Sequence, residues 1–411
     1  MRLRRRGCDT APYDAGWSRF GRPQQQAREE PLEPLLPLEG VKVLDLSRVL
    51  AGPYATMMLA DLGADVLKVE HPERGDDTRH WGPPFAGGES AYFLSVNRNK
   101  RSVGVNLKDP EGLEKVKKLA TSADILIENM RRGALEKLGL GYEGLKEVNP
   151  GLVYCSITGF GPGEDEKRPG YDFLVQARGG IMGITGFPDG EPTKVGVAIA
   201  DMVCGLQAAM AVLAALQRRG VAGEGARIEV SLFESQLSWL ANRAQEYLIS
   251  GEKTGRMGNA HPSIVPYQTF DASDKQIALA VGNDAQFRNL CKALGHEELA
   301  TDERFARNPD RVANRKELVA ILQEEFTKRT ADEWVEQVRG AGVPIGPVNT
   351  LADVFSDGHV LSSDVLQDVE HPAAGMLKML ASPLLVDGER LQIRRPPPTL
   401  GQHTDEVEEW S

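Results

Sequence analysis

The pattern of apolar and polar positions changes abruptly at Leu38. An apolar run over residues 41–46 is followed by Ala51-Gly52-Pro53, by a helical stretch that ends at Leu62-Gly63, and by a second apolar run over residues 64–70. Strand, helix and strand within about 30 residues are typical of a βαβ unit, a parallel strand pair joined by a right-handed crossover. This pattern predicts an α/β fold for the part of the chain that begins at Leu38.

The same rhythm continues beyond this unit. Apolar runs that predict strands occupy residues 103–107, 125–127, 152–157 and 226–230, and helical patterns occupy residues 110–120, 202–216 and 231–249. This alternation predicts an α/β domain with a mostly parallel sheet. The segment 202–216 is apolar except for Gln207, but its 15 residues fall short of the roughly 20 that span a bilayer, so we expect a buried core helix.

The composition and the hydrophobic pattern of the chain change after residue 250. Residues 251–262 are Gly-rich and polar, residues 276–281 have a strand pattern, and residues 286–294, 315–326 and 331–339 have helical patterns. We expect a smaller α+β domain over residues 255–345, and a tail that contains the triple proline 396–398.

Composition excludes several classes of protein. The 411 residues are enough for two or three domains, and a charged share of 26% with an apolar share of 41% is ordinary for globular chains. Lys plus Arg number 48 against 59 Asp plus Glu, a net charge of −11, which gives no argument for nucleic acid or a membrane surface as partner. The four cysteines form no CxxC pair and the histidines no HExxH motif, so we expect no metal and no prosthetic group.

The first 28 residues differ from the rest of the chain in charge. They hold seven arginines against Asp9 and Asp14, a net charge of +5. Two interpretations stay open: a mitochondrial presequence, which would place the protein in the matrix, and a disordered leader on a cytoplasmic protein. Pro12 and Pro23 weaken the amphipathic helix that an import signal needs.

The first βαβ unit invites a dinucleotide interpretation, which its turn contradicts. Residues 47–53 read SRVLAGP and lack the GxGxxG glycines that approach a pyrophosphate, so a NAD enzyme is disfavoured. Lys108, Asn129 and Arg131 each follow a predicted strand, and the ends of parallel strands gather at one edge of a sheet. Two interpretations stay open: these side chains converge at that edge and bind phosphates, or they are solvated charges in loops. The spacing of the residues alone does not distinguish these interpretations.

Asp201 is the most informative acid. It stands between an apolar run and the long apolar helix, where an Asp commonly serves as the N-cap. The positive helix end would also hold the carboxylate ionised and therefore nucleophilic, and a carboxylate engaged in capping attacks poorly. The residues alone leave the capping and the catalytic role in competition.

A series of motifs runs in order from Leu38 to Thr404. They are residues 38–45 (LEGVKVLD), 51–53 (AGP), 62–70 (LGADVLKVE), 75–79 (GDDTR), 99–102 (NKRS), 128–129 (EN), 139–142 (GLGY), 346–348 (GPV) and 400–404 (LGQHT). In this order they resemble the class III CoA-transferases, a family that also contains the acyl-CoA racemases. The segments 81–84, 258–261 and 264–268 look most like its succinyl-CoA:glutarate branch.

The resemblance implies a reaction and a nucleophile. The family's catalytic aspartate precedes a long helix, and the matching residue is Asp201 in AIADM. It implies CoA transfer from an acyl-CoA, expected to be succinyl-CoA, to a carboxylic acid such as glutarate, through an aspartyl mixed anhydride and an aspartyl-CoA thioester. Backbone N–H groups near Gly179-Gly180 or Gly258 are expected to stabilise the oxyanion. The alternatives are a 2-methylacyl-CoA racemase, disfavoured because Tyr171 replaces the racemase histidine, a thioesterase, and a non-catalytic CoA-binding protein.

The resemblance also implies binding residues, with the CoA thioester as a substrate. The expected CoA contacts are Leu50, Ala51, His71, Val105, Asn106, Leu107, Lys108, Asn129, Met130, Arg131, Lys137 and Arg168, and the expected contacts of the acid are Tyr171, Gly258, Asn259 and His261. His71 stands where an arginine is usual, which weakens one phosphate contact. The glycine-rich loop of formyl-CoA transferases is replaced by the shorter GNAH, which disfavours oxalate.

The architecture implied is a Rossmann-like large domain built from both chain ends, a smaller α+β domain, and an interlocked homodimer. The corresponding segments are a leader at 1–37, the first part of the large domain at 38–225, a connecting helix at 226–254, the small domain at 255–345 and a return to the large domain at 346–411.

Overall fold

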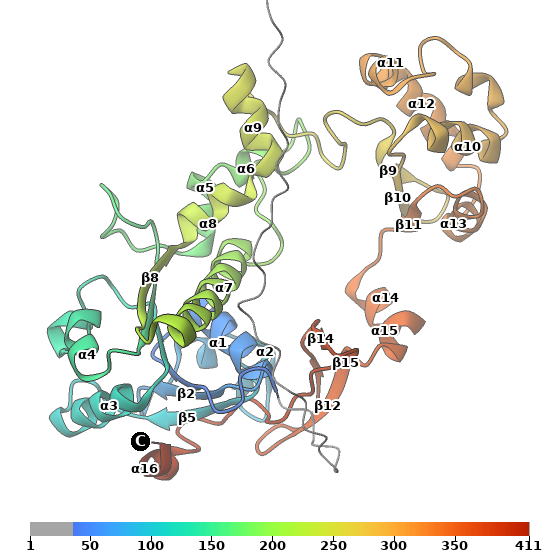
Figure 1. Cartoon of the computed structure of the whole chain (residues 1–411). Helices are drawn as coiled ribbons and strands as arrows, with labels where there is room; N and C mark the ends of the chain where they lie inside the picture. The colour runs from blue at the N-terminus through green and yellow to red at the C-terminus, as the bar shows by residue number, and fades with distance from the viewer. Residues whose placement is uncertain (1–35, 411) are drawn as a thin grey trace, which may run out of the picture. The chain divides into compact units, whose positions relative to one another are not determined.

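A six-stranded parallel sheet is the main feature of the computed structural model, which describes residues 36–410 (Figure 1). Its strands are β1 (Lys42–Asp45), β2 (Asp65–Glu70), β5 (Lys100–Gly104), β6 (Ile125–Glu128), β7 (Val153–Thr158) and β8 (Ala226–Ser231). They lie in the order β5-β2-β1-β6-β7-β8, and every neighbouring pair is parallel. This is the Rossmann strand order, and it confirms the predicted α/β class. The direction of winding reverses between β1 and β6.

Helices cover both faces of this sheet (Figure 1). On one face α1 (Ala51–Asp61) and α7 (Ile199–Ala222) pack on side chains such as Val43 and Ile125. On the other face α3 (Pro110–Ser122), α4 (Tyr142–Val148) and α16 (Val407–Trp410) pack on neighbours such as Leu44. Because successive strand residues point to opposite faces, a strand buried on both sides reads as a continuous apolar run.

Helix α7 has 24 residues, more than the 15 expected, and by length and composition alone it would suffice to cross a membrane. Its Cys204, Ala208 and Val212 are fully buried in the core on the α1 face of the sheet. The prediction of a core helix is thus confirmed for this side of α7.

The C-terminal segment returns to the edge strand of this sheet. The N–H of His403 donates to the carbonyl of Ser102, and the N–H of Gly104 donates to Oγ1 of Thr404 at 3.0 Å. Trp410 is buried beneath the sheet. The six strands all lie within residues 42–231, and the C-terminal segment packs on their edge strand and on one face of the sheet, so both ends of the described chain contribute to this part of the fold.

A second, antiparallel sheet has its own core. Strands β9 (Tyr267–Asp271), β10 (Gln276–Ala280) and β11 (Ile345–Pro347) pack with α10 (Asp284–Leu294), α11 (Asn308–Ala313), α12 (Arg315–Phe326) and α13 (Ala331–Gly340). This is the expected α+β region, while the domain limits given above stay predictions. The remaining elements are η1 (Asp77–His80), β3 (Phe85–Ala86), β4 (Glu89–Ser90), α2 (Ala91–Ser95), η2 (Glu136–Leu138), α5 (Asp172–Arg178), α6 (Ile181–Ile184), α8 (Leu232–Trp239), α9 (Ala241–Ser250), η3 (Glu297–Ala300), α14 (Leu351–Ser356), α15 (Gly358–Ser362), β12 (Leu366–His371), β13 (Gly375–Leu380), β14 (Leu385–Val386), β15 (Glu389–Arg390) and η4 (Thr404–Glu406).

Two predicted elements are corrected. The strand expected at residues 103–107 is β5, which begins at Lys100 and ends at Gly104. Apolar patterning missed its start because Lys100 and Ser102 are buried by polar partners, Asp45 and Glu70. The helix expected at 231–249 is two helices, since the chain bends at Ala241, whose φ is 44°.

Candidate active site

The loop between β1 and α1 lies where the strand order reverses. The N–H of Arg48 donates to Oδ1 of Asn129 at 2.8 Å, and Nδ2 of Asn129 donates to the Arg48 carbonyl at 2.7 Å. Asn129 directly follows β6, so its side chain joins the ends of two neighbouring strands. In open α/β sheets ligands bind in the crevice outside the carboxyl ends of the strands at such a reversal point.

A cavity of about 550 Å³, here called the Asp201 cavity, opens on one side of this loop. It brings together eight predicted residues from four separate segments of the chain: Leu50, Ala51, Asn129, Met130, Arg131, Arg168, Tyr171 and Asp201. The predicted nucleophile therefore shares one cavity with two of the basic residues expected to bind CoA, Arg131 and Arg168.

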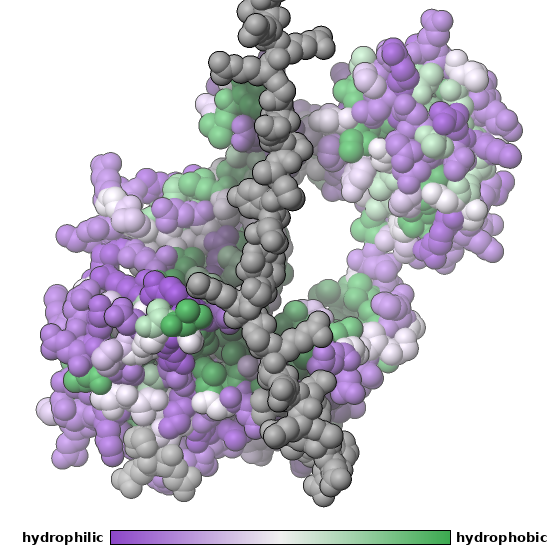
Figure 2. Space-filling model, in the orientation of Figure 1, coloured by the Kyte–Doolittle hydropathy of each residue, from purple (hydrophilic) through white to green (hydrophobic). Residues whose placement is uncertain are grey.

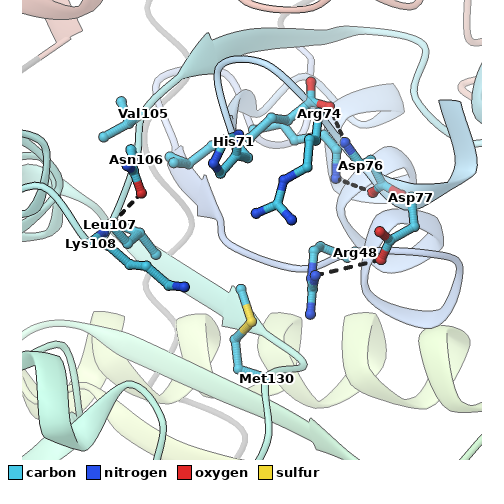
Figure 3. A pocket seen from close by; sticks show the side chains of 14 residues that line it. Arg48, His71, Arg74, Asp76, Asp77, Val105, Asn106, Leu107, Lys108 and Met130 are labelled. Atoms are coloured by element: carbon cyan, nitrogen blue, oxygen red, sulfur yellow. Dashed lines mark hydrogen bonds and ion pairs between the residues drawn. The ribbon is translucent and has the colours of Figure 1, made fainter.

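A second cavity of about 200 Å³, here called the His71 cavity, lies on the other side of the loop (Figure 3). Its lining includes the predicted His71, Val105, Asn106, Leu107, Lys108 and Met130. Figure 3 shows that Arg74 and Lys108 extend their charged ends into it, with Arg48 at its rim beside Asp77. Arg48, Asp77 and Met130 line both cavities, so the two adjoin along the carboxyl edge of the sheet.

Asp201 is the third residue of α7, and Ala198 rather than Asp201 is the N-cap. This corrects the capping role. The expectation of a carboxylate held ionised by the helix end is also corrected. Burial, together with the negative charge of Asp172, raises the pKa of Asp201 to about 7, while no described residue donates a hydrogen bond to its carboxylate. At neutral pH the carboxylate is partly protonated, and once ionised it is poorly solvated, which favours attack on a carbonyl.

Asp172 holds the first turn of α7 from α5. Its Oδ1 accepts the N–H of Ala200 at 2.8 Å, and its Oδ2 accepts Nε2 of Gln176 at 2.7 Å. Oε1 of Gln176 in turn accepts the N–H of Val195 at 2.9 Å. The residue next to Asp201 is thus fixed by a chain of side-chain hydrogen bonds, and two carboxylates are held near each other.

Tyr92 on α2 is a third group in the electrostatic field of this cluster. Burial, followed by the charges of Asp201 and Asp172, raises the pKa of Tyr92 to about 12, so the phenol keeps its proton. The ring of Trp81 packs edge-on against it, with centroids 5.3 Å apart. Tyr171, the N-cap residue of α5, is 60% exposed and lines the Asp201 cavity.

Four predicted residues lie in neither cavity. Lys137 is in η2. Gly258, Asn259 and His261 form a loop of their own, in which the Gly258 N–H donates to the carbonyl of Gly186 and Nδ2 of Asn259 donates to Oγ1 of Thr269. The structure does not bring these four to Asp201, and their roles stay predictions.

Two of the three expected oxyanion donors need correction because their N–H groups already have acceptors, while the expectation for Gly180 stays a prediction. The N–H groups of Gly179 and Gly258 already donate to the carbonyls of Val175 and Gly186. Leu50 and Ala51, by contrast, lie in the Asp201 cavity at the first turn of α1, whose N–H groups the helix itself leaves unpaired. The approach of the two helices is close, since a Cβ on Gly205 of α7 would lie 2.6 Å from the Ala51 carbonyl oxygen.

Sequence reasoning missed Arg48, Asp77 and Tyr92. Arg48 follows β1 just as Lys108 and Asn129 follow their strands, so the same rule would have selected it. Tyr92 carries no such signal, because only the fold brings it to Asp201. Within residues 36–410 no group of three or more His, Cys, Asp or Glu is placed to hold a metal ion.

Comparisons with known proteins point in one direction. Residues 38–404 match the sequence profile described as CoA-transferase family III. The human succinyl-CoA:glutarate CoA-transferase is 45% identical over 388 residues, which are 94% of this chain and 87% of that protein. A succinate–glutarate CoA-transferase of Agrobacterium fabrum is 45% identical over 378 residues, 90% of this chain and 94% of that protein. The crystal structure of a CAIB/BAIF family protein from Brucella suis, 46% identical, superposes with a TM-score of 0.82 over 91% of this chain and 99% of that one.

Proposed function

The chain belongs to CoA-transferase family III and is a CoA-transferase, and from that premise we propose that it carries CoA from succinyl-CoA to a dicarboxylate such as glutarate, with Asp201 as the nucleophile. The observation that carries this proposal is the position of Asp201: a half-buried carboxylate without a hydrogen-bond donor, in the same cavity as several of the predicted CoA contacts. The names of relatives from human, mouse and Agrobacterium support the choice of acids.

The reaction proceeds through three covalent states of Asp201: an anhydride with the donor acid, a thioester with CoA, and an anhydride with the acceptor acid. Its carboxylate attacks the thioester carbonyl, the carbon–sulfur bond breaks, and CoA leaves as a thiolate from a mixed anhydride. The thiolate attacks the aspartyl carbonyl, which releases the donor carboxylate and leaves an aspartyl-CoA thioester. The acceptor carboxylate attacks that thioester to form a second anhydride, and the thiolate then attacks the acceptor's carbonyl and frees Asp201. No water enters the sequence.

Charge at the two cavities supports the binding part of the proposal. Arg48, Arg74 and Lys108 line the His71 cavity, and Arg131 and Arg168 line the Asp201 cavity. The basic residues of the two cavities suit the phosphates of CoA, on a chain whose net charge is otherwise negative. The N–H groups at the start of α1 are the oxyanion donors in this proposal, because Leu50 and Ala51 lie in the cavity of the nucleophile.

We also propose that the chain acts as a homodimer. Large apolar side chains are exposed on neighbouring helices, among them Met210 on α7 and Leu248 and Ile249 on α9, and Figure 2 shows hydrophobic surface over α9. Exposed apolar area of this kind is typical of an interface. Sedimentation velocity that gives the mass of one chain at micromolar concentration would contradict the dimer. The interlocked arrangement stays a prediction, as does the mitochondrial matrix, because residues 1–35 lie outside the described part of the chain.

The test of the function uses succinyl-CoA with glutarate, with oxalate, and without an acceptor. We expect glutaryl-CoA with glutarate, little product with oxalate, and no free CoA without an acceptor. Hydroxylamine or borohydride added during turnover should modify the peptide that contains Asp201. Full transfer by Asp201→Asn would end the proposal, release of CoA without acceptor would indicate a thioesterase, and exchange of an α-proton of 2-methylacyl-CoA in deuterated water would indicate a racemase.

A further inference from the structure

Side chains rather than neighbouring backbone hold residues 47–49, the loop that leads into the Asp201 cavity. Oδ1 of Asp45 accepts the N–H of Ser47 at 2.9 Å, and Nζ of Lys68 donates to the Ser47 carbonyl at 2.9 Å. Arg48 is held at both its N–H and its carbonyl by Asn129. Residues 47 and 48 belong to no strand, helix or turn, so their conformation depends on these side chains.

The contact from Lys68 to the Ser47 carbonyl involves a lysine that is part of a buried ion pair. Nζ of Lys68 lies 2.9 Å from Oδ2 of Asp76, and both side chains are fully inaccessible. The same carboxylate accepts the N–H of Val49 at 3.2 and 3.3 Å, and it accepts the N–H of Thr78 at 3.0 Å. Lys68 on β2 and Asp76 before η1 therefore hold the loop on both sides of Arg48, at the Ser47 carbonyl and at the Val49 amide.

Val49 occupies a backbone conformation that its side chain disfavours. Its φ is 71°, in the left-handed region, which costs a β-branched residue of the order of 1–3 kcal/mol. Such a conformation persists only where surrounding contacts enforce it. The next residues are Leu50 and Ala51, which line the Asp201 cavity, and Val49 packs in the apolar cluster around Leu50. A relaxed Val49 would therefore turn the start of α1 away from the nucleophile.

We propose that the Lys68–Asp76 pair is a positioning device of the transfer reaction: it enforces the left-handed conformation of Val49 and so fixes the first turn of α1 opposite Asp201. Both residues line the His71 cavity, but their side chains are fully inaccessible, and both act through the backbone of the loop. This inference rests on the proposed role of Asp201, but Lys68 and Asp76 are not among the predicted site residues.

The charge balance of the surroundings is consistent with an ion pair that stays charged. Burial alone would raise the pKa of Asp76, but the charge of Lys68 and the hydrogen bonds from Thr78 and Lys68 lower it to about 2. Burial alone would lower the pKa of Lys68, and Asp76, Asp45 and Glu70 together raise it. The pair is thus ionised throughout the range in which the enzyme would work.

The test is Asp76→Asn in the full chain, with and without Val49→Gly. The single variant should lower kcat about tenfold or more, because small displacements of reacting groups cost that much, with KM for succinyl-CoA within about threefold. Glycine adopts a positive φ without strain, so Asp76→Asn/Val49→Gly should recover a large part of kcat although it removes an apolar side chain. A merely structural pair predicts the reverse, a further loss.

The matched control is Asp61→Asn, which disrupts another buried pair, Arg98–Asp61 at 2.6 Å, on the far end of α1. It should lower the melting temperature as Asp76→Asn does and leave kcat within about twofold. Should Asp76→Asn fail to fold, Lys68→Met/Asp76→Asn leaves neither partner as an unpaired buried charge and should show the same loss of kcat and the same rescue by Val49→Gly.

Two results would overturn the inference: kcat of Asp76→Asn within about twofold of the parent, or no recovery on addition of Val49→Gly. Failure of the proposed function would look different, since Asp201→Asn would then retain transfer whatever the variants at Asp76 did.

Discussion

Asn129 and Arg48 exchange two hydrogen bonds, of 2.8 and 2.7 Å, across the point where the winding of the sheet reverses. One amide side chain thereby joins the end of β6 to the loop after β1, and the two candidate cavities lie on either side of that loop. A ligand as long as CoA, with phosphates at one end and a thioester at the other, would need such a pair of adjoining cavities. Four predictions follow from the geometry around this junction.

Asp201→Asn should abolish transfer, with a loss of about a thousandfold or more, and leave CoA binding within about threefold. The same change should stabilise the protein at neutral and higher pH. The folded pKa of Asp201, about 7, lies above its ordinary value of 3.8. Between these two pH values the carboxyl group ionises in the unfolded chain but stays protonated in the folded protein. The free energy of unfolding therefore falls as the pH rises from 3.8 to about 7, and the full destabilisation is present above 7.

Urea unfolding measures this stabilisation. We expect Asp201→Asn to raise the free energy of unfolding by roughly 1–4 kcal/mol at pH 8 and by less at pH 5. If the free energy of unfolding at pH 8 rose no more than at pH 5, or fell, the carboxylate would not be desolvated in the folded protein.

The pH profile of the parent enzyme should report the same group. Because attack needs the ionised carboxylate, kcat/KM should rise about tenfold per pH unit below 7 and level off above it. Asp172→Asn removes the nearby negative charge and should shift the midpoint to lower pH. A midpoint that stays in place would show that burial alone raises the pKa of Asp201.

Arg48→Ala should raise KM for succinyl-CoA about tenfold with little change in kcat, because a phosphate contact contributes to binding throughout the reaction. Asp77→Asn, which frees Arg48 from its ion pair, should lower KM or leave it unchanged. Lys117→Ala is the control: this lysine lies on α3, pairs with Glu114 and lines neither cavity. If Arg48→Ala and Lys117→Ala raised KM equally, the effect of Arg48 would come from the net charge of the protein and not from a direct phosphate contact.

Two glycines of α7 offer a matched pair. Gly205→Ala places a Cβ 2.6 Å from the Ala51 carbonyl oxygen and should destabilise the protein by about 1–3 kcal/mol and lower kcat, because α1 must move away from Asp201. A Cβ at Gly220 meets no described atom within 4 Å, and Gly220→Ala should stabilise the helix by roughly 0.5–1 kcal/mol. Both effects are measured by thermal unfolding and steady-state kinetics.

Much of the candidate site follows from one property of parallel sheets. Their strands end at a common edge, so residues directly after apolar runs, such as Lys108 and Asn129, could be grouped before any coordinates were known. The same reasoning applies to Arg48. The rule requires a strand that is recognisably apolar, and the bounds of β5 were misplaced because its first residue, Lys100, is a charged side chain buried against Asp45.

Other parts of the site had no local signal. Asp172 raises the pKa of Asp201 from 29 positions earlier in the sequence, through packing of α5 on α7. The N-cap rule for Asp201 failed by three residues because Ile199 and Ala200 already belong to the helix. Helix ends are set by backbone geometry, and a suitable side chain near an end does not fix which residue begins the helix.

The contact between the segment 401–404 and β5 has a consequence for biosynthesis. Residues separated by about 300 positions must meet before the edge strand of the main sheet is covered. While the ribosome is still translating the middle of the chain, that edge has no partner, and an uncovered strand edge is prone to pair with other chains. Newly made protein should therefore depend on chaperones until translation has passed residue 404, and truncation before Gly401 should yield aggregates rather than a smaller soluble enzyme.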